Sequence, residues 1–270
     1  MPIKTIDPFD EFYCMSSHDS DLAFTVREIY ETYNKKVCID RKSIHRFGEN
    51  LAVKNVETPI HPWGEFEDYQ TSNVILNLCS SDNADTSTVT IEYMSFDVNG
   101  DFVFATQTKT LTGQTPVTLN DTGCRWMRMY TDDAHVGDIW LYRGDATSGV
   151  PDDLTKVHNQ ILIGASQSQK ASTSVAKDNY MIVTHIWSDV IRKTGTNSVL
   201  NFKTKALGGT FKNILRRGLS DSNALKYECV PRIIIEPNTD IEITAQTDSM
   251  SDTDMTAGFN GYFADIISSD

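Results

Sequence analysis

The 270-residue chain lacks long apolar runs, and its N-terminus lacks the apolar segment of a signal peptide. No stretch approaches the roughly 18 apolar residues that a membrane-spanning helix needs. Asp7, Asp10 and Glu11 stand where a signal peptide would carry its apolar core. We therefore expect a chain that is made in a cytosol, is not exported by the usual route and has no membrane partner.

Basic residues are also scarce relative to acids. The chain has 24 Lys and Arg against 37 Asp and Glu, which gives a net charge of −13. Because phosphate binding needs a basic face, we expect no direct nucleic-acid binding. The excess of acids suits a soluble protein that avoids self-association until its partner arrives. With 39% hydrophobic residues, the chain can still bury a substantial core.

The sequence lacks the cysteine and histidine spacings that are typical of metal sites, and it lacks the motif that surrounds a catalytic serine nucleophile. The five cysteines are scattered, odd in number and without a C-x-x-C pair, so we expect reduced thiols, several of them small core residues. There is no H-x-H, H-E-x-x-H or G-x-S-x-G motif. Gly208-Gly209 lacks the context of a phosphate-binding loop and predicts a hairpin turn. We therefore expect no enzyme activity, no cofactor and no structural metal.

One acidic loop leaves an alternative open. Asp248, Asp252 and Asp254 form the densest cluster of carboxylates. The loop could coordinate calcium through oxygen ligands, but it lacks the glycine and the distal glutamate of an EF-hand loop. A solvated loop between two strands is the favoured interpretation.

A single helix is predicted near the start, over Ser20–Asn34. Its apolar residues recur at helical spacing and form one stripe. The stripe consists of Leu22, Val26, Ile29 and Tyr33. It is either a packing face against the chain's own core or a partner-binding face, and the sequence leaves both open.

After Phe47-Gly48 the pattern changes to strands separated by turn residues. Polar and apolar residues alternate over Thr88–Tyr93, Ala224–Cys229 and Asp240–Ala245. About ten to twelve short strands without interleaved helices exclude a βαβ design and favour an all-β antiparallel sandwich or barrel. We expect residues 1–46 to form an N-terminal arm with one helix and residues 47–270 to form one β-sandwich. The apolar residues of the three alternating segments should then share one core.

Charge is segregated in the C-terminal third of the chain. Between Asp189 and Asp221 there are bases but no acids, whereas eight acids and no base follow Arg232. The basic residues of this stretch are Arg192, Lys193, Lys203, Lys205, Lys212, Arg216 and Arg217. The basic stretch could meet the acidic stretch of another copy, or the two could neutralise each other within one fold.

The C-terminal region carries a resemblance to a known class of proteins. Two stretches, Val230–Ala245 and the following Met255–Phe263, resemble the C-terminal end of jelly-roll virion proteins of tailed bacteriophages, particularly marine ones. The resemblance lies in the order of Pro237-Asn238-Thr239-Asp240-Ile241, Thr244-Ala245, an acidic loop and Ala257-Gly258-Phe259-Asn260-Gly261-Tyr262. Cys79–Ile91 and Gly137–Leu141 are similar to earlier strands of the same proteins. The resemblance covers about residues 47–270 and implies a sandwich of jelly-roll type.

The resemblance implies a non-enzymatic virion subunit: a capsid decoration protein, a head-fibre base or a tail accessory protein. Such a subunit would be assembled in the host bacterial cytoplasm and reside in the virion. Its expected partners are other virion proteins, either the major capsid protein or tail and portal proteins. The resemblance also implies a homotrimer. We expect sandwich edges to hold the copies together and the arm, residues 1–46, to anchor them.

The main alternative is a receptor-binding, carbohydrate-binding β-sandwich of the phage tail. That function would need a groove lined by exposed Trp or Tyr, with carboxylates nearby. The tryptophans are Trp63, Trp126, Trp140 and Trp187, and core packing is their favoured role. Buried tryptophans would count against this alternative, and an exposed coplanar pair would support it. A soluble hydrolase has no support beyond the abundance of Asp and Glu.

Overall fold

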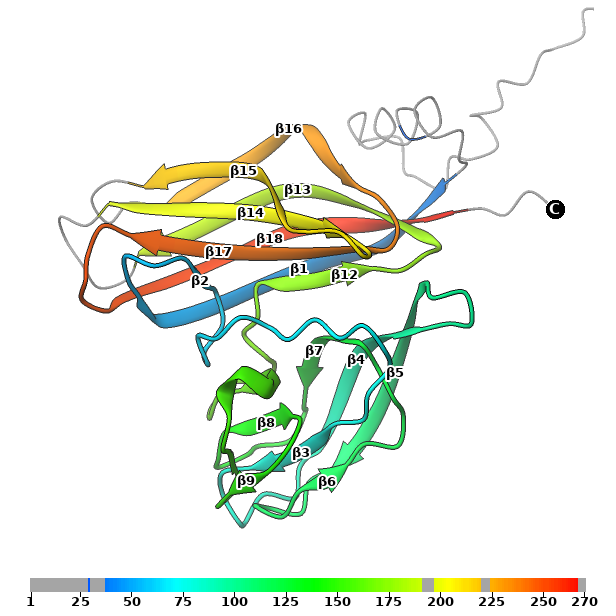
Figure 1. Ribbon diagram of the computed structural model, residues 1–270, viewed down its shortest axis with the longest axis vertical. Helices are drawn as coiled ribbons and strands as arrows, with labels where there is room; N and C mark the ends of the chain where they lie inside the picture. The colour runs from blue at the N-terminus through cyan, green and yellow to red at the C-terminus, as the bar shows by residue number, and fades with distance from the viewer. Residues whose placement is uncertain (1–28, 30–36, 191–196, 220–223, 267–270) are drawn as a thin grey trace, which may run out of the picture.

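The structure is a computed structural model that describes residue 29 and residues 37–190, 197–219 and 224–266, with the side chains of 37–42 excepted. It is an all-β protein in which every strand pair of the described residues is antiparallel. Two bodies are visible: an upper one with β1, β2 and β12–β18, and a lower one with β3–β11 (Figure 1). Among the described residues, no helix has the length and apolar content needed to cross a membrane.

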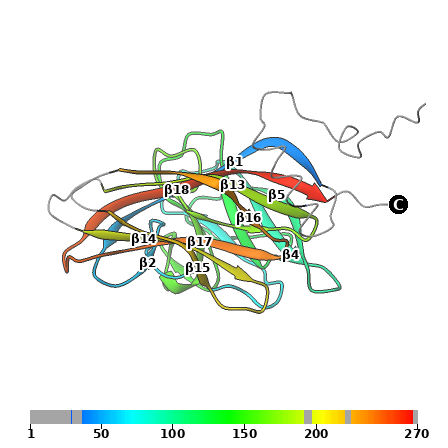
Figure 2. The same ribbon diagram turned by 90° about the horizontal axis from the view of Figure 1, so that it is seen from above.

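The upper body, which we call the sandwich, consists of two sheets lying face to face (Figure 2). The first sheet has the order β1 (Val37–Val53), β18 (Thr253–Ile266), β13 (Asn179–Val190), β16 (Leu225–Ile235). The second has the order β12 (Ser172–Val175), β17 (Thr239–Thr247), β14 (Ser198–Ala206), β15 (Lys212–Leu219). The short β2 (Thr58–Pro59) also pairs with β17.

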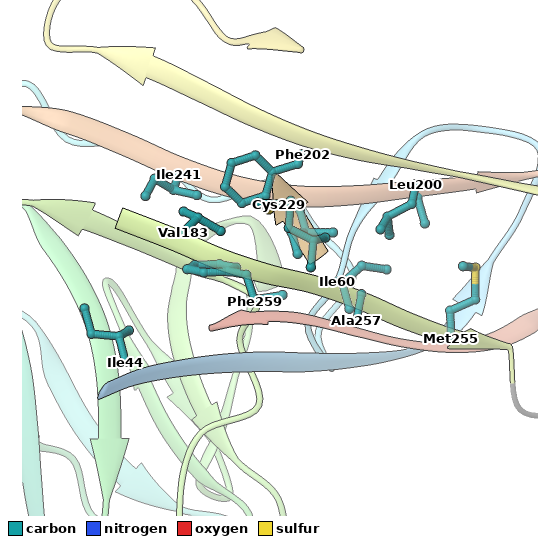
Figure 3. Packing of buried hydrophobic residues seen from close by; sticks show 14 of the residues in the cluster. Ile44, Ile60, Val183, Leu200, Phe202, Cys229, Ile241, Met255, Ala257 and Phe259 are labelled. Atoms are coloured by element: carbon teal, nitrogen blue, oxygen red, sulfur yellow. The ribbon is translucent and has the colours of Figure 1, made fainter. Parts of the chain in front are cut away.

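The core of the sandwich lies between these two sheets (Figure 3). Ile241, Ile243 and Ala245 of β17 point into it because alternate strand residues face the same side. Phe202 of β14 meets Phe259 of β18 edge to face, with ring centroids 5.6 Å apart. Their contact links the two sheets, and both side chains are fully buried.

The lower body, which we call the second body, is inserted between β2 and β12. Its strands are β3 (Asn77–Ser80), β4 (Thr88–Phe96), β5 (Phe102–Thr110), β6 (Val117–Thr118), β7 (Arg125–Tyr130), β8 (Ile139–Tyr142), β9 (Ala146–Thr147), β10 (Val150–Pro151) and β11 (Val157–Ile161). A short 3-10 turn, Leu154–Lys156, precedes β11. The strand orders are β11-β8-β3-β6, β5-β4-β7 and β10-β9. This body has a core of its own, which includes Leu78, Ile91, Trp126 and Leu141.

The expectation that three alternating segments share one core is wrong. Val89, Ile91 and Tyr93 lie in the core of the second body, whereas Cys229 and Ile241 lie in that of the sandwich. Alternation shows which face of a strand is buried but not which strand it faces. The expected boundary at residues 46 and 47 also differs from the structure, since β1 begins at Val37.

Other local predictions agree with the structure. The alternating segments form β4, β16 and β17, and Gly208-Gly209 lies in the hairpin between β14 and β15. Gly208 has a φ of +75°, a conformation that residues with a Cβ rarely adopt. Of the predicted helix 20–34, only Ile29 is among the described residues. It is helical and buried against Tyr180, Ile182 and Ala264 of the first sheet.

Candidate functional site

The residues predicted to bind partners fall into four groups in the structure. Ile29 is buried against the first sheet. Leu22, Val26, Tyr33, Arg192 and Lys193 lie outside the described residues. Lys203 and Lys205 lie on β14, and Arg216 and Arg217 lie on β15. The side chains on β14 and those on β15 have different surroundings.

Lys203 and Lys205 are engaged within the chain. The Lys203 Nζ lies 2.9 Å from Glu57 Oε1 and 3.8 Å from Glu242 Oε1. The Lys205 Nζ lies 3.3 Å from Asp240 Oδ2 and 3.9 Å from the centre of the Tyr69 ring. For these two lysines, the basic and acidic stretches neutralise each other inside one fold.

These pairs belong to a buried polar network that we call the junction, because it connects the sandwich with the second body. Arg125 of β7 donates from Nε and Nη2 to the two carboxylate oxygens of Asp240 of β17, at 2.8 and 3.0 Å. Ser174 of β12 donates to Asp240 at 2.7 Å. Close by, Lys170 forms an ion pair of 2.7 Å with Glu67. Both ion pairs are almost fully withdrawn from solvent.

Burial in the junction displaces several pKa values. Burial raises the pKa of Glu242 to about 7, although Lys203 and a hydrogen bond from Tyr69 oppose the shift. Burial would also raise the pKa of Glu67, but Lys170 and His158 lower it to about 2. Burial lowers the pKa of His61 to about 3, and repulsion from Lys170 adds to this effect.

The junction is filled rather than hollow. The space between Glu67, Tyr69, Arg125 and Lys170 has a volume of about 0 Å³ for a water-sized molecule. Displaced pKa values occur at catalytic sites, but structural ion-pair networks produce them as well. With its charges paired and its space filled, the junction holds parts of the chain together.

Arg216 and Arg217 instead lie at the outer edge of the sandwich, on β15. This strand pairs with β14 on one side, and no other strand of the described residues pairs with it. Lys212, Ile214 and Arg216 are exposed, and Ile214 keeps 48% of its surface accessible. The Arg217 guanidinium lies 4.8 Å from the centre of the Tyr227 ring of β16. We call this unpaired side of β15 the β15 edge.

A groove lies beside the β15 edge, between the margins of the two sheets. Its volume is about 320 Å³. Ile214, Ile233 and Ile235 provide apolar surface, while Lys212 and Glu236 provide opposite charges. An unpaired strand edge next to apolar and charged surface is the kind of place where another chain adds to a sheet.

The carboxylates of the acidic loop interact with separate partners. Asp248 accepts hydrogen bonds from the backbone and side-chain amides of Asn197, at 3.1 and 2.7 Å. Asp252 pairs with Lys54 at 3.1 Å. Among the described residues, no group of three or more His, Cys, Asp or Glu side chains could hold a metal ion. The structure therefore gives no support to the calcium alternative.

Most tryptophans pack in the interior, as the favoured interpretation predicts. Trp63, Trp126 and Trp140 are buried, and only Trp187 is partly exposed. Cys79, Cys124 and Cys229 are buried free thiols, which agrees with their prediction as small core residues. Burial raises the pKa of Cys124 to about 12.

Comparisons with known proteins give weak likenesses. No protein-family model matches the sequence, and no curated protein sequence is similar to it. The VP2 subviral particle protein of infectious bursal disease virus is 9% identical, with a TM-score of 0.23 over 83% of this chain and 72% of that chain. A tandem CBM22-1-CBM22-2 domain of Xyn10C from Paenibacillus barcinonensis is 10% identical, with a TM-score of 0.25 over 84% and 93%. Neither likeness establishes a common fold or function.

Proposed function

We propose that this chain is a non-enzymatic structural subunit of a tailed-phage particle, built on a jelly-roll sandwich. The strand order carries the proposal. When the two-residue β2 is set aside, the sandwich has eight strands. Counted along the chain, the first, eighth, third and sixth form one sheet, and the second, seventh, fourth and fifth form the other. This order is that of the double-sheet jelly roll, an architecture of viral capsid and lectin domains.

The position of the second body fits this assignment. It enters the chain between the first and second strands of the sandwich, so it does not interrupt the pairing of the eight strands. The sequence segments that resemble phage virion proteins lie on both bodies, in β3, β4, β8, β16, β17 and β18. The subunit would therefore present a sandwich and a projecting second body on the particle.

The exposure and the charge of the β15 edge support the proposal that copies assemble through it. A copy with a net charge of −13 repels its neighbours at long range, so close approach needs local complementarity. Lys212 and Arg216 provide a basic edge that an acidic surface of a second copy can meet. The homotrimer and the attachment to the major capsid, tail or portal proteins rest on the resemblance. In this proposal the segment ahead of β1, which includes Ile29, anchors the subunit.

The chemistry of the junction supports a structural role over a catalytic one. Its buried carboxylates face Lys170, Lys203, Lys205 and Arg125, and the space among them is filled. A substrate would have to displace these pairs to reach Glu242. We therefore assign no catalytic residue.

Quantitative mass spectrometry of purified phage particles tests the proposed function. We expect the chain to be present in a copy number divisible by three. A number comparable to that of the major capsid protein would indicate capsid decoration, and a few copies would indicate the tail-accessory alternative. Absence of the chain from particles of the phage that encodes it would overturn the proposal.

A further inference from the structure

A row of polar side chains crosses the outer face of the first sheet, opposite the sandwich core. His45 of β1 lies beside Asn260 of β18, which lies beside His185 of β13. The neighbouring residues Ile44, Phe259 and Ile186 point into the core, so the row points outward. His45 Nδ1 forms a hydrogen bond with Asn260 Oδ1, and this contact connects the first two members of the row.

Two irregularities shape a depression along this row. The register between β13 and β18 shifts at Thr184, and the register between β13 and β16 shifts in the same place. The shift places Arg232 of β16 near the row, where it donates to the backbone oxygen of Thr184 at 3.2 Å. The resulting cavity has a volume of about 380 Å³. Ligand sites commonly measure roughly 300–1,000 Å³.

Polar side chains dominate the lining of this depression. His45, His185, Arg232 and Asn260 contribute nitrogen and oxygen atoms, and Tyr262 contributes a hydroxyl and an aromatic ring. Such a lining does not favour an apolar ligand, because the polar groups would lose their hydrogen bonds to water. It suits a ligand with many hydroxyl groups.

An aromatic pair lies next to the depression. The rings of Trp187 and His45 are inclined by only 16°, with centroids 6.1 Å apart. Gly258 of β18 makes room for this arrangement, because a Cβ there would lie 2.7 Å from the Trp187 ring. Trp187 is the one partly exposed tryptophan of the chain. The exposed part of the Trp187 indole offers an apolar surface beside the depression, against which the apolar face of a sugar ring can pack.

We propose that the depression between His45, His185 and Arg232 binds a sugar that carries a carboxylate. Hydroxyl groups of the sugar would bond to Asn260 and the two imidazoles, and the carboxylate would meet the Arg232 guanidinium. Glu228 lies 3.7 Å from that guanidinium and is 59% exposed, so the ligand would share Arg232 with it. This site lies on the outer face of the first sheet and does not depend on the proposed virion function.

Isothermal titration calorimetry on the full chain tests the site with three probes at equal ionic strength: sodium D-glucuronate, D-glucose and sodium acetate. We expect glucuronate to bind with a dissociation constant on the order of 1 mM. Glucose and acetate should bind at least about tenfold more weakly, because glucose lacks the carboxylate and acetate lacks the hydroxyl groups and the sugar ring. Equal binding of acetate and glucuronate would indicate a simple anion site and overturn the proposal. Equal binding of glucose, or no heat with any probe, would also overturn it.

Variants locate the binding in the depression. His45→Ala and His185→Ala should each weaken glucuronate binding by about tenfold or more. Phe104→Ala is the matched control, because it removes a ring that is 48% exposed on β5 of the second body. The control should bind glucuronate as the unaltered chain does, and circular dichroism should show that all variants are folded. Undiminished binding in both histidine variants would contradict the location of the site.

Discussion

Glu242 of β17 is a residue whose surroundings reverse the usual effect of pH on a carboxyl group. Its pKa is about 7 in the folded chain, whereas the pKa of an ordinary glutamate is 4.5. Above pH 4.5 the unfolded chain loses this proton, whereas the folded chain keeps it until about pH 7. The contribution of Glu242 to the free energy of unfolding is therefore largest below pH 4.5, and it is lost as the pH rises to about 7.

We expect Glu242→Gln to remove this loss, since the amide keeps the neutral state at every pH. Denaturant unfolding at intervals from pH 4.5 to 8 should show the variant gaining stability relative to the unaltered chain as the pH rises, by at most a few kcal/mol. His61 produces the opposite trend, because its neutral folded form is favoured above about pH 3. The difference between the two chains cancels that contribution. A constant difference across the range would contradict the assigned role of Glu242.

At the same scale, the polar residues of β17 show where sequence reasoning failed. Asp240, Glu242 and Thr244 alternate with apolar residues, a pattern that predicts a solvent-exposed face. The structure buries this face as well, because the second body and the linking segments cover it. Their partners Arg125, Glu57 and Tyr69 are more than a hundred residues away in sequence, so spacing carried no signal of the junction.

At the scale of elements, most strands could be predicted and β1 could not. Alternation located β4, β16 and β17, and turn glycines located the hairpin before β15. Strand β1 begins at Val37 with Asp40, Arg41 and Lys42 close behind, and these three consecutive charged residues break the alternation that identifies a strand. The predicted arm therefore includes ten residues, 37–46, that belong to the first sheet.

This correction changes the truncation that tests the anchor. Deleting residues 1–36 should leave the sandwich folded but prevent incorporation into particles. Deleting residues 1–46 should also destabilise the sandwich, because it removes Ile44 from the core and Arg46 from its 3.1 Å ion pair with Glu92. Circular dichroism, thermal unfolding and particle incorporation of both truncations distinguish these effects.

Each truncation has an outcome that would contradict the prediction. Normal incorporation of the chain lacking residues 1–36 would show that this segment is not the anchor. Equal stability of both truncations would show that the first part of β1 contributes little to the sandwich. The β signal serves as the control for folding in each case.

At the scale of the whole molecule, the sequence predicts an all-β chain but not its division into two bodies. The insertion between β2 and β12 contains strands, such as the nine-residue β4, that match strands of the sandwich, such as the nine-residue β17, in length and in alternation of polar and apolar residues. No shift in composition marks the ends of the insertion. The segments that connect it to the sandwich contain buried residues such as Ile60 and Ala171, which belong to the core of the sandwich. The two cores become distinct only when the partners of each strand are known.

At this scale, the arrangement of the strands determines which charged residues remain available to a partner. The basic stretch looks uniform in sequence, yet Lys203 and Lys205 are used inside the junction, while Lys212 and Arg216 stay exposed on β15. Strand pairing determines this split, because β14 is internal to its sheet and β15 lies at its edge. An interface between copies therefore centres on the β15 edge in our account.

Light scattering of the purified chain after size-exclusion chromatography tests this central claim most directly. We predict a trimer with three times the mass of the 30.3 kDa chain, and a monomer for Arg216→Glu, which reverses the charge of an exposed edge residue. Lys109→Glu makes the same reversal on β5 of the second body and should remain trimeric. A monomeric unaltered chain, or a trimeric Arg216→Glu variant, would contradict assembly through the β15 edge.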